Sequence, residues 1–266
     1  MALYLCYTCN KYFLLRYTAK QYNMKTIRIA LLLVLTAATA AAQENEQVDG
    51  KNMIKLNVPA LALKNISVQY ERAISHRFTA GATVRFMPKG KLPFKSLISK
   101  IADDNDVERQ LANTEVGNRA IMPEIRWYVG KKGAFRGFYL GAYAHIARSE
   151  ADLDYEYDDG GITKFIPLSG NINSITGGLQ LGAQWKLSKA IYLDWWILGV
   201  HGGKSKGDLE GKQSLTASEQ QAIRDELDEL DRPNDIRYNV DANGATVYYD
   251  GPWAGVRAGL CIGIRF

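Results

Sequence analysis

The sequence predicts an all-β fold, an eight-stranded antiparallel up-and-down transmembrane β-barrel with short helices in two outer loops. Three observations predict it. An export signal lies near the N-terminus, no later apolar run is long enough for a membrane helix, and strictly alternating segments recur eight times. A chain that spans a bilayer without apolar helices must form a closed barrel, because each backbone polar group has to be paired inside the hydrocarbon.

The first 42 residues are expected to be absent from the mature protein. From Met24, a short basic segment precedes an apolar core over residues 29–35 and three alanines that end at residue 42. This is the arrangement of a secretory signal peptide with a small-residue cleavage site, which directs export through the general secretory pathway. The expected divisions are a mis-assigned N-terminal extension (1–23), the signal peptide (24–42) and an outer-membrane β-barrel domain (43–266).

The basic balance of the whole chain belongs to the segment that would be removed. The chain has 33 Lys and Arg against 28 Asp and Glu; residues 1–42 hold five of the basic residues and no acidic one, which leaves 28 against 28. A nucleic-acid partner is therefore not expected. Cys6 and Cys9 offer half of a zinc site with no second pair, and Cys261 is the one cysteine after the signal. We expect no disulfide, metal or cofactor.

The last expected strand shows the alternation most clearly. Apolar side chains occupy every second position from Ala254 to Phe266, with glycine, arginine and Cys261 between them. In a membrane barrel the apolar set faces lipid and the small or polar set faces the lumen. Pro59 cannot donate to a strand ladder and is expected to mark a bulge. The eight expected strands cover residues 54–58, 66–71, 78–86, 121–129, 138–146, 178–187, 191–197 and 254–266.

The connections give an independent check on the register. Three-residue turns at 75–77 and 188–190 would pair Ile74 with Phe78 and Leu187 with Ile191, so that outward faces meet outward faces. Short turns on the periplasmic side and longer outer loops are typical of bacterial barrels. The expected short turns are 75–77, 130–137 and 188–190, the longer loops are 88–118, 154–173 and 204–252, and a tight outer turn at 63–66 is the exception.

Two outer loops carry helical patterns, over residues 94–111 and 217–231. Phe94, Leu97, Ile98 and Ile101 form one apolar stripe. The second helix begins with a capping box from Thr216 to Glu219. Its apolar face consists of Ile223, Leu227 and Leu230. These helices could lie on the rim, on the lipid surface or against a partner; packing against their own barrel is the favoured interpretation.

Inward-facing charges are the candidate site. We expect Glu124 and Arg85 in the outer half on adjacent strands, and Asp194 diagonal to Lys186 near the periplasmic end. An eight-stranded barrel is just wide enough for side chains to fill, which favours a salt-bridged plug over a selectivity constriction or ligand pocket. The expected lumen charge network comprises Lys55, Glu71, Arg85, Glu124, Arg126, Lys186, Asp194, Arg257 and Arg265.

Catalytic and metal-binding patterns are weak. His145 and Ser149 would lie about 13 Å apart on one strand, and no triad emerges with His76 or His201. The acidic run at residues 152–159 lacks the glutamate that an EF-hand requires at its twelfth position. We therefore expect no catalytic residue and no enzyme. The aromatic residues instead favour membrane girdles, with Tyr70, Trp127, Phe138 and Trp185 near the periplasmic turns and Phe86 near the opposite rim.

Residues 54–57, 67–73, 123–128 and 130–141 resemble a family of uncharacterised outer-membrane β-barrel proteins, a domain of unknown function common in the Bacteroides group, with a small OmpA-like barrel architecture. The segment from Asn65 to Arg72 is the most specific part. The resemblance implies an outer-membrane location and assembly through an aromatic C-terminal residue, here Phe266. It brings no catalytic residue with it.

The sequence thus predicts a non-enzymatic outer-membrane barrel that is structural or binds a surface ligand or protein through its outer loops. A narrow, porin-like pore for small solutes and a lipid-modifying outer-membrane enzyme are the alternatives. The expected partners are outer-membrane lipid and lipopolysaccharide, the barrel assembly machinery, and a ligand at the outer loops.

Overall fold

The structure is a computed structural model that describes residues 50–91, 114–228 and 235–266. The expected N-terminal extension, the signal peptide and the expected 94–111 helix lie outside these residues, as does Leu230. Within the described ranges, no helix is both long and apolar enough to cross a membrane.

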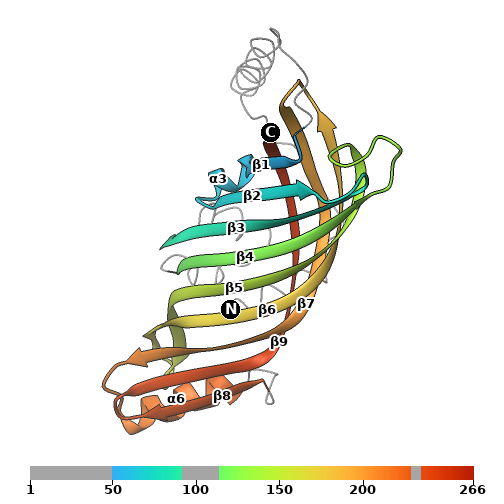
Figure 1. Cartoon of the computed structure of the whole chain (residues 1–266). Helices are drawn as coiled ribbons and strands as arrows, with labels where there is room; N and C mark the ends of the chain where they lie inside the picture. Colours follow the sequence, from blue (N-terminus) through green and yellow to red (C-terminus); the bar gives the residue numbers. More distant parts are fainter. Residues whose placement is uncertain (1–49, 92–113, 229–234) are drawn as a thin grey trace, which may run out of the picture.

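Eight antiparallel strands form a ring in which each strand pairs with the next along the chain, and the first pairs with the last (Figure 1). A further strand, β8 (Ile236–Asp241), pairs with one end of β9. This arrangement confirms the predicted all-β, up-and-down architecture. The ring strands are β1 (Asn52–Asn57), β2 (Ile66–Ala73), β3 (Phe78–Lys91), β4 (Glu115–Tyr128), β5 (Gly137–Asp158), β6 (Thr163–Lys186), β7 (Ile191–Lys212) and β9 (Gly244–Arg265).

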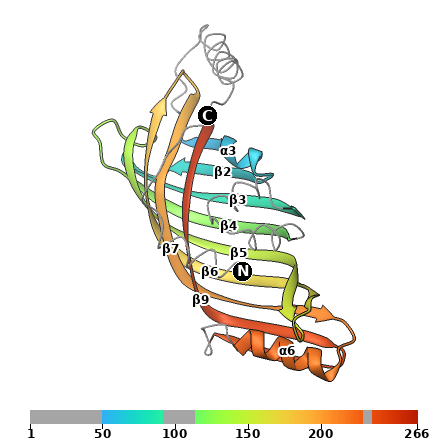
Figure 2. The same ribbon diagram turned by 180° about the vertical axis from the view of Figure 1, so that it is seen from behind.

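The predicted short turns connect the strands at one end of the ring, called here the turn end. Ile74 N donates to Phe78 O at 3.0 Å, and Leu187 N donates to Ile191 O at 2.9 Å. Both predicted pairings are therefore confirmed. The opposite end of the sheet carries β8 and helix α6 (Ala217–Asp228), far from the C-terminus in both views (Figures 1 and 2).

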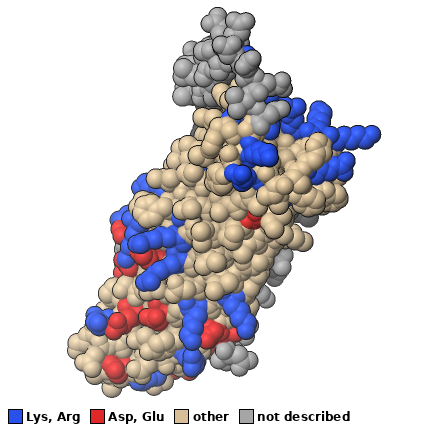
Figure 3. Space-filling model, in the orientation of Figure 1, with Lys and Arg blue, Asp and Glu red and all other residues tan. Residues whose placement is uncertain are grey.

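Side chains alternate in and out of the ring as predicted. In β9, Val256 is 75% exposed, whereas Cys261 is 1% exposed and lies inside. Figure 3 shows a broad surface with few charged side chains between basic residues at the turn end and mixed charges at the opposite end. The residues predicted for the girdles all face outward, namely Tyr70, Phe86, Trp127, Phe138 and Trp185, together with Phe266.

The strands are longer than predicted, and three predicted loops are wrong at their ends or throughout. Residues 154–173 belong almost entirely to β5 and β6, residues 204–252 contain the end of β7, α6, β8 and the start of β9, and β3 and β4 extend into 88–118. Side chains keep alternating between the two faces of the strands in these segments, but on β5 the outward positions include the charged residues Asp154 and Glu156. The polar composition of these strand ends therefore resembles that of a loop.

The long ends of β5, β6, β7 and β9 form a platform with β8 and α6 at the end of the sheet opposite the turn end. Helix α6 packs on this sheet, which agrees with the favoured interpretation that it lies against its own chain. The predicted capping box is present, since Glu219 N donates to Thr216 Oγ1 at 3.4 Å and Thr216 N donates to Glu219 Oε2 at 2.8 Å. The platform core comprises Tyr157, Ile166, Leu168, Leu215, Ile223, Leu227, Val240 and Ala245.

The first strand ends earlier than predicted, and Pro59 marks a helix rather than a bulge. Strand β1 stops at Asn57, and helix α3 (Val58–Ala62) follows it. The Asn57 side chain caps this helix by accepting from Ala60 N at 3.4 Å. Proline is well tolerated in the first turn of a helix, where the N–H that it lacks would have no intrahelical partner. The predicted tight turn at 63–66 is therefore the end of a helical connection.

A charged clasp fastens α6 to the tip of the β5–β6 hairpin. Lys164 Nζ lies 2.7 Å from Asp159 Oδ2 and 2.9 Å from Glu219 Oε1, and Ser218 Oγ donates to Asp159 Oδ1 at 2.7 Å. Hydrogen bonds from Lys164, which has the largest effect, and from Thr216 lower the pKa of Glu219 to about 2. Hydrogen bonds from Lys164 and Ser218 also lower the pKa of Asp159.

We expect the attachment of α6 to weaken as the pH falls from 5 to 2. A carboxylate with a depressed pKa contributes stability above its ordinary value of about 4 and loses it as the pH falls through the folded value. The distance between spin labels on Thr163→Cys and Gln221→Cys should increase at a lower temperature at pH 2 than at pH 5, which shows that α6 has left the hairpin.

Lys164→Gln should lower that temperature at pH 5 and move the remaining pH dependence upward toward pH 4, because the main cause of the depressed pKa is gone. Lys206→Gln, which removes an exposed ion pair to Asp250 elsewhere on the platform, is the control and should keep the native pH dependence. Equal separation temperatures at the two pH values in the native protein would contradict the clasp.

Candidate functional site

Buried ions fill the lumen near the turn end. Arg126 Nη1 lies 2.6 Å from Asp194 Oδ2 and 3.4 Å from Glu71 Oε2, and Arg126 Nε donates to Glu124. Lys55 pairs with Glu71 and lies 2.6 Å from Asp194 Oδ2. None of these five side chains is more than 1% exposed. Four strands contribute them, so the contacts cross the lumen.

Arg257 completes the lumen ion cluster, which we define as Lys55, Glu71, Glu124, Arg126, Asp194 and Arg257. Arg257 Nη1 lies 3.4 Å from Glu124 Oε2, and its side chain is 9% exposed. The cluster thus holds three cations and three anions. Buried ions are tolerated where each is paired and hydrogen-bonded, because the lost hydration must be replaced.

Neutral side chains donate further hydrogen bonds to the carboxylates of the cluster. The Tyr139 hydroxyl donates to Asp194 Oδ1 at 2.9 Å, and Trp196 Nε1 donates to Asp194 Oδ2 at 3.1 Å. Tyr128 donates to Glu71 at 2.9 Å, and Gln69 donates to Glu124 at 2.7 Å. These donors come from strands around the ring, so the cluster and its ligands form a plug.

A second obstruction lies at the turn end itself. Phe135, from the β4–β5 connection, packs with Met53 and Tyr192 inside the ring, and all three side chains are fully buried. The Arg265 guanidinium lies 5.0 Å from the centroid of the Phe135 ring and donates to the Tyr192 hydroxyl at 3.1 Å. The connection is held by Ala134 N, which donates to His76 O at 2.7 Å.

The predicted lumen charge network divides into separate groups. Lys186 is half-buried, and together with Lys132 and Arg136 it lines a cavity of about 630 Å³ at the turn end. Asp194 is diagonal to Lys186 as predicted, since Gln184 stands opposite Asp194 and Tyr192 stands opposite Lys186 in the β6–β7 register, but Asp194 forms its ion pairs with Lys55 and Arg126. Arg265 packs against Phe135 instead of joining the cluster.

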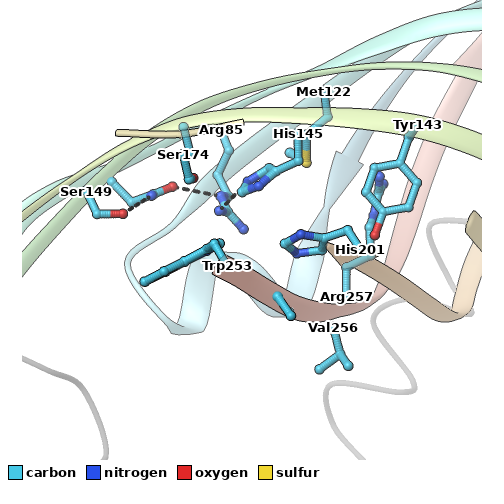
Figure 4. Close-up of a pocket in the computed structure, with 14 residues that line it drawn as sticks. Arg85, Met122, Tyr143, His145, Ser149, Ser174, His201, Trp253, Val256 and Arg257 are labelled. Carbon is cyan, nitrogen blue, oxygen red and sulfur yellow. Dashed lines mark hydrogen bonds between the residues drawn. The ribbon is translucent and has the colours of Figure 1, made fainter. Parts of the chain in front are cut away.

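A second cavity, of about 260 Å³, lies on the platform side of the lumen ion cluster (Figure 4). His145 and His201 lie with their ring centroids 4.9 Å apart, and Arg85 Nη2 is 3.2 Å from His145 Nε2. Arg85 thus belongs to this cavity, whereas Glu124 belongs to the cluster. We call it the basic cavity; its lining residues are Arg85, Asn118, Met122, Tyr143, His145, Ala147, Ser149, Ser174, His201, Trp253, Ala254, Gly255, Val256 and Arg257.

His201 reaches the basic cavity because β7 has a bulge. The pairing between β7 and β9 shifts between Trp196 and Gly199. Without the extra residue, alternation from the inward Asp194 would place His201 on the outer face. Gly255 makes room for it, since a Cβ at that position would lie 2.7 Å from His201 Nε2. A strict alternation along β7 therefore does not predict that the two histidines converge.

Two hydroxyl groups in or beside the cavity have side-chain partners other than His145. Ser149 Oγ accepts from Asn118 Nδ2 at 3.0 Å, and Thr176 Oγ1 lies 2.8 Å from His201 Nδ1. Among the residues that the structure describes, no carboxylate lines the cavity. Across the described part of the chain, no group of three or more His, Cys, Asp or Glu side chains could hold a metal ion. The guanidinium groups and neutral polar groups of this lining could bind an anion.

Arg126→Ala should destabilise the barrel by about 3–5 kcal/mol, because it leaves Glu71, Glu124 and Asp194 buried with too few cations. Urea unfolding in phospholipid vesicles measures the loss. Lys186→Ala is the control, since Lys186 lies outside the cluster, and should change stability by no more than about 0.5 kcal/mol. Equal effects of the two substitutions would contradict the ion cluster.

Comparisons with known proteins identify a family. A family model described as a protein of unknown function (DUF3575) matches residues 26–201, which is more than half of the chain. No curated protein matches the sequence. Among solved structures, the translocator domain of the autotransporter NalP from Neisseria meningitidis is similar, with 11% identity, coverage of 94% of this chain and 100% of that chain, and a TM-score of 0.32. The chain therefore belongs to the DUF3575 family of proteins of unknown function.

Proposed function

We propose that this protein is a non-enzymatic outer-membrane barrel with a sealed lumen, which holds the platform above the membrane for a surface ligand or protein. The lumen ion cluster is the observation that carries the proposal. Five of its side chains are at most 1% exposed, and they connect across the interior. A continuous water path through the ring would have to displace them.

The outer surface supports the membrane location. Large apolar side chains point away from the ring at alternate positions of its strands, as lipid-facing residues do. Strands β5, β6, β7 and β9 have 22 or more residues each. A barrel strand needs about 9–11 residues to cross the hydrocarbon, so roughly half of each of these strands would project beyond it.

The projecting part has the properties of a binding surface. It has its own apolar core and the charged clasp, so its shape does not depend on a partner. One edge of β8 pairs with β9, and no other described strand pairs with the opposite edge. An exposed strand edge offers backbone groups to an extended partner segment, which is the mode of binding that we propose.

Purified protein in planar bilayers should give no reproducible conductance steps, because the lumen ion cluster and Phe135 block the path. Removing Glu124, Arg126 and Phe135 together, by substitution with alanine, keeps the charge balanced and removes three bulky side chains from the two obstructions. This triple variant should conduct or leak, whereas Lys186→Ala should stay closed.

Gel mobility that shifts on heating verifies that each sample is a folded barrel. Steady conductance from the native protein would overturn the sealed lumen in favour of the narrow pore. Release of fatty acid from lipopolysaccharide by the native protein would overturn the non-enzymatic proposal.

A further inference from the structure

The basic cavity has more positive charge than the carboxylates of the described residues neutralise. Arg85 contacts Asn118 and His145, and no carboxylate among the described residues forms an ion pair with it. Arg257 shares its partner Glu124 with Arg126, which makes the closer contact. A confined cation without a counter-ion is costly, and a bound anion would offset that cost.

Two of the residues that line this cavity have a buried polar atom without a hydrogen-bond partner among the described residues. The Tyr143 hydroxyl oxygen and His145 Nδ1 are buried and make no hydrogen bond within the described structure. Such groups are uncommon in folded proteins, because an unmade hydrogen bond costs free energy. Ser149 and Ser174 add hydroxyl groups to the same wall. Guanidinium groups with several neutral donors suit the oxygen atoms of a phosphate group.

The cavity borders an interruption in the described strand ladder beside β9, where it is lined by residues from both faces of that strand. Residues 244–249 of β9 pair with β8, and residues 261–265 pair with β1. Between them, no described strand pairs with the edge of β9 that faces away from β7. The cavity is lined by Arg257 on the inner face and by Ala254 and Val256 on the outer face; in Figure 4, Val256 points away from the histidines.

Helix α3 is the reason for this interruption in the wall. Strand β1 has six residues and ends at Asn57, where α3 replaces it and so leaves the neighbouring stretch of β9 without a strand partner. Leu61 and Leu63, which lie at the end of α3, are 45% and 47% exposed. The side of the opening formed by α3 is therefore apolar, while the interior is cationic.

We propose that the basic cavity binds the phosphate group of an amphiphile that enters from the lipid side, between β9 and α3. The phosphate lies among Arg85, His145, His201 and Arg257, and the acyl chains stay outside along β9. The lipid route rests on the proposed membrane location. A phosphate free in solution presents the same oxygen atoms, so the test must separate the two sources.

Calorimetric titration of the full protein in detergent micelles separates them. The probes are dihexanoyl phosphatidic acid, dihexanoylglycerol, which lacks only the phosphate, and glycerol 3-phosphate, which lacks the acyl chains. Phosphatidic acid should bind at least about tenfold more tightly than either of the others, because only it offers both the phosphate and the apolar part.

Arg85→Gln should weaken binding of phosphatidic acid about tenfold, as expected for one lost charge-assisted hydrogen bond. Arg119→Gln, at an exposed position on β4, is the matched control and should have no effect. Val256→Trp should obstruct the lateral opening and weaken binding of phosphatidic acid, and it should leave glycerol 3-phosphate unchanged. Heat-dependent gel mobility shows that the variants are folded.

Equal binding of phosphatidic acid and dihexanoylglycerol, or no effect of Arg85→Gln, would overturn recognition of phosphate. Glycerol 3-phosphate binding as tightly as phosphatidic acid, with Val256→Trp affecting neither, would overturn lipid entry. Conductance is measured separately, so a sealed barrel that binds no phosphatidic acid contradicts this inference and leaves the proposed function in place.

Discussion

The pairing of buried charges in a narrow lumen is the constraint on which the rest of the structure depends. A ring of eight strands leaves room for side chains and little else. Arg126 and Lys55 are acceptable there because Glu71 and Asp194 contact both of them. This shared coordination ties strands from opposite sides of the ring together, and it also divides the interior into a plugged half and a half with a cavity.

Much of the fold could be predicted from the sequence because a period of two is a strong signal where lipid or solvent meets a sheet. The same two-residue period also predicts which residues pair across the turns at 75–77 and 188–190. The platform was missed because Asp154 and Glu156 alternate with tyrosines, so that strands which pack against a helix resembled a polar loop. Pro59 was assigned to a bulge, since a proline that ends a strand and one that begins a helix give the same local signal.

The membership of the ion cluster could be predicted, but its pairings could not. The alternation of side chains along each strand identifies which charged residues face the lumen. The contacts between them depend on how the strands face each other across the lumen. Lys186 occupies an inward position of the alternation, but it lies too near the turn end to join the cluster. Strict alternation places His201 on the outer face, whereas one extra residue in β7 turns it inward; the consecutive apolar residues Ile197 and Leu198, which break the alternation, are the signal in the sequence.

The two halves of the lumen have opposite electrostatic character, balanced in the cluster and basic in the cavity, and the balance is the central claim. A double-mutant cycle with Lys55→Met and Asp194→Asn tests it most directly. The account predicts that the two losses of unfolding free energy sum to more than the loss in the double variant, by at least about 1 kcal/mol. Losses that add to within about 0.5 kcal/mol would show that the two ions do not compensate each other and would contradict it.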